Sequence, residues 1–259
     1  MIYVCYQHKG GSGKTTTVAN LAGALAMAGK KVLCVDGDAQ ANLTVSLGHK
    51  DPEALEGSIY NLFWGEVNVK DIIRKTTVEN VHLINSSEDL YAIDMDIYRN
   101  PDQFPINTAQ SILKNALEAV KGEYDYVLID TPPSINIVTI NALAAADYVL
   151  PVLQTEYLAT KGMKKLLETI EEIKQLNPDL KIAGVIGTMF DKRTIMATSV
   201  MQDARKYFDR LDVKVYDTVI PRTIRFGEAP AHGKPAVCYD NSPAVQDYVA
   251  LAQEVFNIG

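Results

Sequence analysis

The chain has 259 residues, of which 47% are hydrophobic, and this suits one large domain with a substantial core better than two domains. Its net charge of −7 excludes a global polycation, so any binding of nucleic acid must depend on a local basic patch. No apolar run reaches about 18 residues, which excludes a membrane-spanning helix, and scattered cysteines without a Cys-x-x-Cys pair predict buried, reduced thiols in a cytoplasmic protein.

A glycine-rich segment follows the first predicted strand, which spans residues 2–6. It reads Gln-His-Lys-Gly-Gly-Ser-Gly-Lys-Thr-Thr over residues 7–16, and apolar residues then recur at helical spacing over residues 18–25. A strand, a glycine-rich loop and a helix form the context of a phosphate-binding loop, in which backbone N–H groups and the helix N-terminus face an anion. Lys14 can reach the β- and γ-phosphates, and the Thr15 hydroxyl can ligate Mg²⁺.

Aspartates follow two of the predicted strands. Asp36 and Asp38 come directly after the strand at residues 32–35, and the strand–helix–strand spacing predicts a right-handed parallel crossover. We expect one of these two aspartates to have a structural role near the Mg²⁺ shell. Asp130 ends a strong predicted strand at residues 124–130, as a Walker B carboxylate does, and would hold Mg²⁺ through a water.

Strands and helices alternate along the rest of the chain. Further strands are predicted at residues 81–84, 147–152, 181–188 and 213–219, and helices at residues 58–64, 136–145, 159–176, 194–210 and 243–256. Asn100-Pro101 and Phe104-Pro105 punctuate two more helices, and residues 51–110 are expected to have a lid or packing role. The alternation predicts an α/β fold with a doubly wound, mostly parallel sheet flanked by helices, in a single domain over residues 1–259. Ligands of such sheets bind at the carboxyl edge, where the glycine-rich loop, Asp38 and Asp130 project.

The glycine-rich loop departs from the strict nucleotide-loop pattern, which has glycine where this chain has His8. It fits the deviant form Lys-Gly-Gly-x-Gly-Lys-Thr, which carries an additional lysine, Lys9. In this the chain resembles the ParA/MinD branch of P-loop ATPases, and within it the ParA/Soj DNA-partition proteins. Similar blocks recur over nearly the whole chain, at residues 130–134, 141–147, 188–191, 220–225 and 228–235, and the last two favour the partition proteins.

The resemblance implies an ATPase with ATP and Mg²⁺ as cofactors and a slow basal turnover. Lys9 would reach across a two-fold interface to the partner's nucleotide, so that a homodimer encloses two ATP molecules. Asp38 matches the carboxylate that orients the attacking water, although Ala39 and Ala41 stand where the family has proline and glycine. The implied site residues are Asp38, Lys9 and Lys14 for catalysis; Lys9, Gly10, Gly11, Ser12, Gly13, Lys14, Thr15, Thr16, Met189, Pro221 and Thr223 for ATP; and Thr15 and, through a water, Asp130 for the metal.

Basic residues in the C-terminal part of the chain are candidates for DNA binding. Residues 189–259 hold nine Lys/Arg and nine Asp/Glu, whereas the remaining 188 residues hold 16 and 23. Arg193 and Arg222 match family positions that bind double-stranded DNA without sequence preference. The weaker candidates are Arg205, Lys206 and Arg210, because cations are favoured near a helix C-terminus in any case.

The resemblance favours one function over three alternatives. It implies a cytoplasmic, nucleoid-associated DNA-segregation ATPase whose hydrolysis is stimulated by a ParB-like, centromere-binding partner. A MinD-like membrane-cycling ATPase would need a basic amphipathic C-terminal helix, whereas residues 248–259 carry one charge, which is acidic, so no membrane is expected. An electron-transfer ATPase would need paired cluster cysteines, and a non-enzymatic ATP-gated scaffold stays open. The chain starts at the strand before the loop, so we expect no N-terminal helix-turn-helix extension.

Overall fold

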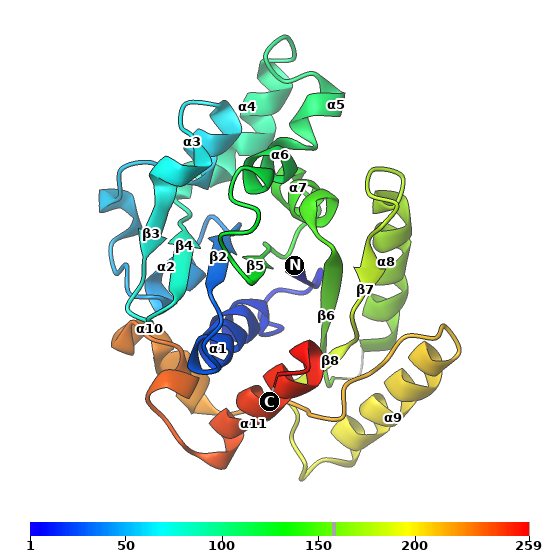
Figure 1. The fold of residues 1–259 in the computed structure, drawn as a ribbon. Coiled ribbons are helices and arrows are strands. Elements are labelled where there is room, and N and C mark those ends of the chain that lie inside the picture. The colour runs from blue at the N-terminus through cyan, green and yellow to red at the C-terminus, as the bar shows by residue number, and fades with distance from the viewer. Residues whose placement is uncertain (157–158, 259) are drawn as a thin grey trace.

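The apolar runs of the sequence pair into one sheet whose strands are parallel except at one edge (Figure 1). The computed structural model describes residues 1–156 and 159–258. The strand order is β3-β4-β2-β5-β1-β6-β7, and β8 pairs with β6. The strands are β1 (Ile2–Tyr6), β2 (Val32–Asp36), β3 (Ile73–Lys75), β4 (Val81–Ile84), β5 (Tyr126–Asp130), β6 (Tyr148–Gln154), β7 (Lys181–Ile182) and β8 (Ile186–Thr188). The doubly wound, mostly parallel α/β sheet expected from the sequence is confirmed.

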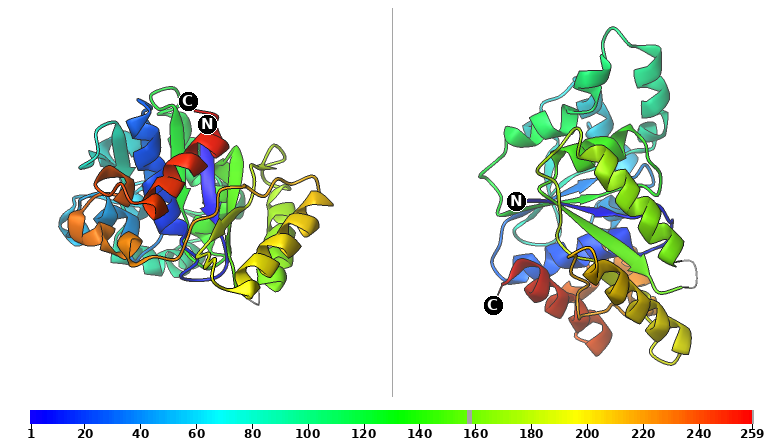
Figure 2. Two further views of the ribbon diagram at one scale, coloured as in Figure 1. Left: turned by 90° about the horizontal axis from the view of Figure 1, so that it is seen from below. Right: turned by 90° about the vertical axis from the view of Figure 1, so that its right-hand side faces the viewer.

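Helices cover both faces of the sheet, because alternate residues of each strand point to opposite sides. In β1, Tyr3 and Cys5 join the core beneath α1 (Lys14–Met27) and α11 (Pro243–Phe256). Val4 and Tyr6 join the core on the other face, beneath α3 (Ile59–Trp64), α6 (Ile112–Glu118), α7 (Ile137–Ala145) and α8 (Ala159–Ile173). Figure 2 shows these two layers from two further directions. The remaining helices are α2 (Asn42–Ser46), α4 (Ile93–Arg99), α5 (Ile106–Ala109), α9 (Ile195–Asp209) and α10 (Ala229–His232). Within the described ranges, no helix combines the length and the apolar character that crossing a bilayer requires.

The C-terminal part of the chain packs directly on α1. The Thr17 hydroxyl lies 3.1 Å from that of Tyr248, and Asn20 Oδ1 accepts the Val237 N–H over 3.1 Å. Gly23 faces Val237 so closely that a Cβ there would come within 2.6 Å of a Val237 methyl group. The helix that follows the glycine-rich loop is therefore held by Tyr248 and Val237, which come 231 and 217 positions after the residues that they contact.

The expected strand over residues 181–188 is wrong as a single element, because it divides into β7 and β8. Gly184 stands between them with a φ of 151°, and a Cβ there would lie 2.7 Å from the Tyr216 ring. The Tyr216 hydroxyl donates to the Ala183 carbonyl over 3.0 Å. A side chain from a later segment thus covers the point where a continuous strand would have run.

Other elements differ from the expectation in extent. The expected strand over residues 213–219 is wrong, since in the described part of the chain its pairing is one isolated bridge, between Val185 and Val215. The helix expected over residues 159–176 ends at Ile173. Strands β1 and β2 are parallel as expected, but β5 lies between them. The short antiparallel edge strand β3 was not predicted at all.

Candidate nucleotide-binding site

The glycine-rich loop lies at the carboxyl edge of the sheet, between β1 and α1 (Figure 1). Gly11 and Gly13 have φ angles of 68° and 91°, a left-handed backbone that residues with a side chain rarely adopt. The loop lines a cleft of about 680 Å³, which is within the range of small-molecule sites. The predicted site residues that line this cleft are Gly10, Gly11, Ser12, Gly13, Lys14, Thr15, Thr16, Asp38 and Met189. The structure therefore brings most of the predicted nucleotide-binding residues together.

Lys14 is buried inside the loop, with 6% of its surface exposed. Its Nζ donates to the carbonyl oxygens of Gln7 over 3.1 Å and of Lys9 over 3.4 Å. None of the ion pairs in the described part of the chain includes Lys14. A buried cation is costly unless an anion accompanies it, so this loop suits a phosphate. The buried Ser12 hydroxyl also lacks a partner among the described residues and adds a donor.

Two buried carboxylates, Asp36 and Asp130, lie opposite each other at the ends of the neighbouring strands β2 and β5. Burial raises the pKa of Asp36 to about 6 and that of Asp130 to about 8, and the charge of Asp36 adds to the shift of the Asp130 pKa. The Thr44 N–H and hydroxyl donate to Asp36 Oδ2 over 2.8 and 2.7 Å. These bonds tie Asp36 to the start of α2, whereas Asp38 lines the cleft.

Asp130 keeps one oxygen available for a cation. Its Oδ1 accepts the Thr131 N–H over 3.1 Å, whereas the buried Oδ2 has no hydrogen-bond partner among the described residues. Thr15 and the charge of Lys14 partly offset the raised pKa of Asp130, so both groups lie near this carboxyl. An orphaned buried oxygen next to a hydroxyl fits hydrated Mg²⁺, which usually takes one or two protein ligands and fills its shell with water and phosphate. No cluster of three or more His, Cys, Asp or Glu side chains suited to a metal occurs in residues 1–156 and 159–258.

Asp38 lines the cleft from the loop after β2. Its N–H donates to Asp36 Oδ1 over 3.2 Å, and its Oδ1 accepts the Gln40 N–H over 3.1 Å. Ala41 closes the turn by donating its N–H to the Asp38 carbonyl over 2.8 Å, and it does so with a left-handed backbone, φ 51° and ψ 30°. Such a conformation costs a residue with a Cβ about 1–2 kcal/mol. The alanine therefore strains the turn that holds Asp38 but leaves the carboxylate in the cleft.

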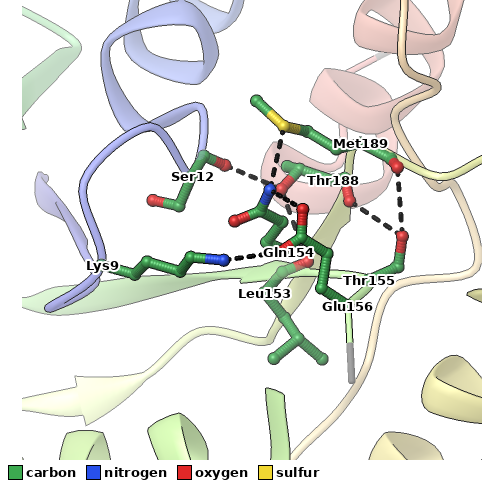
Figure 3. A network of polar contacts seen from close by, with 8 residues as sticks. All are labelled: Lys9, Ser12, Leu153, Gln154, Thr155, Glu156, Thr188 and Met189. Carbon is green, nitrogen blue, oxygen red and sulfur yellow. Dashed lines mark hydrogen bonds and ion pairs between the residues drawn. The ribbon is translucent and has the colours of Figure 1, made fainter. Parts of the chain in front are cut away.

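Lys9 is not among the residues that line this cleft, because its ammonium pairs with Glu156 over 2.6 Å (Figure 3). The two side chains are 54% and 46% exposed. Glu156 Oε1 also accepts Gln154 Nε2 over 2.7 Å, and the same amide donates to Met189 Sδ over 3.4 Å. Figure 3 shows these side chains as one network that runs from the glycine-rich loop to the end of β8. Lys9 can reach a second molecule only after its pair with Glu156 opens.

The other predicted residues lie beside the cleft. Pro221 and Thr223 line a neighbouring cavity of about 1240 Å³, together with Arg193 and Arg222. An isolated β-bridge joins Pro221 to Phe190, and Phe190 directly follows Met189 in the chain. Contact of Pro221 and Thr223 with ATP, and of the two arginines with DNA, stays a prediction.

Sequence reasoning missed three residues of this region. Tyr91 and Asp94 line the cleft from a 3₁₀ turn, Glu88–Ala92, and from α4, a segment for which only a lid or packing role was expected. Their spacing carries no motif that could have identified them. Glu156 carried only a weak signal, because it comes four residues after the end of the strand predicted at residues 147–152.

Comparison with known proteins agrees with this geometry. Residues 1–182 match a family model described as an AAA domain. The sporulation initiation inhibitor protein Soj of Bacillus subtilis is 45% identical over 95% of this chain and 94% of its own length. The chromosome partitioning protein ParA of Caulobacter vibrioides is 41% identical over 96% of this chain and 91% of its own length. This chain belongs to the ParA/Soj family of P-loop ATPases.

Solved structures extend the likeness of this ParA/Soj chain to nucleotide-bound proteins. Cobyrinic acid a,c-diamide synthase from Mycobacterium smegmatis, with bound ADP and magnesium, is 33% identical, with a TM-score of 0.82. The match covers 99% of this chain and 94% of the synthase chain. Nucleotide and Mg²⁺ binding is thus a property of this fold family, and the ParA/Soj chain carries the loop and the carboxylate that such binding needs.

Proposed function

We propose that this ParA/Soj chain is a DNA-segregation ATPase. It binds ATP and Mg²⁺, forms a homodimer around two ATP molecules, and in that state holds double-stranded DNA without sequence preference. A ParB-like, centromere-binding partner stimulates a slow basal hydrolysis, and the protein works on the nucleoid in the cytoplasm. The observation that supports this best is the cleft itself, in which Lys14 lacks a carboxylate partner and Asp130 keeps an oxygen free, among the described residues.

Each part of the cleft has a task in this proposal. The N–H groups of the loop and the ammonium of Lys14 neutralise phosphate charge, and Thr15 and Asp130 hold Mg²⁺, which spreads that charge further when bound. Asp38 orients a water molecule toward the terminal phosphate. Since phosphoryl transfer depends mainly on positioning and charge stabilisation, Asp38 does not need to be a strong base.

Lys9 supplies the link between nucleotide and dimer. Its exposed side chain sits on the rim of the cleft and pairs with Glu156 rather than with the loop's own interior. We propose that it leaves Glu156 to contact the phosphates bound by the partner subunit. ATP would then stabilise the dimer, and hydrolysis would loosen it.

Arg193 and Arg222 are the proposed DNA contacts. Both side chains are exposed and line one cavity near the N-terminal end of α9. Arg205 lies ten residues after Ile195, the first residue of α9, about 15 Å along the helix axis, where it pairs with Asp217 over 2.5 Å. Arg205 also donates to the Tyr216 carbonyl, and its side chain is 42% exposed against 85% for Arg193, so the proposed DNA surface is centred on the N-terminal end of α9.

The proposal is tested by retention of the protein on DNA with ATP, with ADP and without nucleotide. We expect retention with ATP alone, and at least about a tenfold loss for Arg193→Ala and Arg222→Ala combined, because each removes a phosphate contact. Arg99→Ala, which removes another exposed arginine on α4, is the matched control. Equal retention in all three nucleotide states would refute the switch. Unchanged hydrolysis in Asp38→Ala would show that Asp38 is not catalytic.

A MinD-like membrane-cycling function has less support. That function needs a free amphipathic helix at the C-terminus. Here α11 buries Tyr248, Leu251 and Val255 in the core against α1, so its apolar face is already occupied. ATP-dependent binding to liposomes would favour this alternative over DNA segregation.

A further inference from the structure

The Arg193 guanidinium is held by a neighbouring carboxylate, Asp191. Arg193 Nε donates to Asp191 Oδ1 over 2.9 Å, and Nη2 donates to Oδ2 over 2.7 Å. The Arg193 N–H donates to the same Oδ1 over 3.0 Å. These hydrogen bonds lower the pKa of Asp191 to about 2, so the carboxylate is charged throughout the physiological range.

This pair occupies the donors that a phosphate would use. Arginine binds carboxylate and phosphate in the same way, through two parallel N–H bonds from one edge of its fork. In Arg193 the Nε and Nη2 donors already bind Asp191, although 85% of the side chain is exposed to solvent. Asp191 also acts electrostatically with Arg222, the other proposed DNA contact, and both line the same cavity. The Asp191 carboxylate therefore neutralises Arg193 and lies close enough to Arg222 to reduce the positive potential there as well.

The position of Asp191 connects this pair with the nucleotide-binding cleft. Asp191 is two residues after Met189, which lines the cleft and has a left-handed backbone with a φ of 53°. Met189 Sδ accepts the Gln154 amide that also binds Glu156, the partner of Lys9 (Figure 3). A cavity of about 470 Å³ is lined by Lys9, Glu156, Met189, Asp191 and Arg222 together. Side-chain contacts from Lys9 to Met189, followed by two residues of the chain, thus lead from the glycine-rich loop to the proposed DNA-binding arginines.

We propose that Asp191 is a masking carboxylate, which keeps Arg193 from DNA phosphates until the segment from Met189 to Asp191 moves. The proposal rests on the proposed DNA-segregation function, and it assigns the control of DNA affinity to a residue that does not itself touch DNA. Lys9 binds Glu156 Oε2, and the Gln154 amide binds Oε1 and Met189 Sδ. Once Lys9 leaves, Glu156 is free to move, and the Gln154 amide and Met189 can move with it. The arrangement seen here is then the one with low affinity for DNA.

The test compares Asp191→Asn with the unmodified chain, by DNA binding without nucleotide over a series of salt concentrations. Asparagine keeps the shape of the side chain and removes its charge. We expect about fivefold tighter binding at low salt, the effect of releasing one exposed arginine from an ion pair. The slope of log affinity against log salt should steepen by about 0.9, the value of one added phosphate contact. A residue that only supported the loop would not change this slope.

Two further variants separate the explanations. Asp217→Asn removes the same charge from the pair with Arg205, toward the other end of α9, and should change the affinity by less than about twofold. Adding Arg193→Ala to Asp191→Asn should abolish the gain. An equal gain from Asp217→Asn, or a gain that survives the loss of Arg193, would overturn the masking role.

The outcome also distinguishes this inference from the proposed function. If the unmodified chain binds DNA with ATP and Arg193→Ala weakens that binding, but Asp191→Asn leaves the nucleotide-free state unchanged, only the masking role fails. If no variant binds DNA in any nucleotide state while thermal melting shows that all are folded, both the function and the inference fail.

Discussion

Replacing Glu156 by glutamine should strengthen the nucleotide-dependent dimer. Glu156 pairs with Lys9 over 2.6 Å, and in the proposed function this pair opens when Lys9 contacts the partner's nucleotide. Both side chains are about half exposed, so the pair stabilises the closed arrangement by only about 0.2–1 kcal/mol. A two-fold dimer opens two such pairs, which gives about 0.4–2 kcal/mol in total. The dissociation constant of the dimer should therefore fall by about twofold to thirtyfold.

Sedimentation equilibrium with a non-hydrolysable ATP analogue and Mg²⁺ measures this change. The gain should shrink as salt is added, because exposed ion pairs are screened. Glu168→Gln is the matched control, since it removes the same charge from an exposed pair with Lys164 on α8. A dimer of Glu156→Gln that is no tighter than the unmodified one, or an equal gain in Glu168→Gln, would refute the reasoning.

Two further predictions concern stability. Ala41→Gly should raise the free energy of unfolding by about 0.5–1 kcal/mol in denaturant titrations. Glycine adopts the backbone at φ 51° without strain, and this gain exceeds the entropy that the more flexible glycine loses on folding. A loss of stability would show that this turn is not strained. Burial raises the pKa of Asp130 to about 8, so the folded, metal-free protein binds more protons than the unfolded chain between about pH 4 and pH 8. The free energy of unfolding measured in EDTA should consequently fall as the pH rises through this window, by at most about 1.4 kcal/mol per pH unit for this group. Asp130→Asn should flatten the profile, and parallel profiles of the two proteins would contradict the assignment.

The parts of the site that sequence reasoning placed correctly depend on neighbours in the chain. A strand, a run of glycines and a helix follow one another within residues 2–27, and their order alone fixes where backbone donors gather. Asp130 was placed because it directly ends an apolar strand. The resemblance implies glycine at the position of Ala41, and the left-handed backbone there explains that preference.

The parts that were missed depend on residues far apart in the sequence. Lys9 and Glu156 are 147 positions apart, and neither residue type predicts that they meet. The strand over residues 181–188 is divided by packing of the Tyr216 ring over Gly184, although the local pattern favours one strand. Hydrophobic periodicity shows which residues are buried, but not which distant side chain covers them.

The packing of the last helix on α1 bears on how this protein emerges from the ribosome. Synthesis runs from the N-terminus, so the glycine-rich loop and α1 are made first, while Val237 and Tyr248, which touch α1, are made nearly last. Until then Thr17 and Gly23, which Tyr248 and Val237 cover in the folded protein, expose the outer side of α1 to solvent. A nascent chain stalled before residue 237 should therefore fail to retain nucleotide, even though every residue proposed to bind phosphate has already been made.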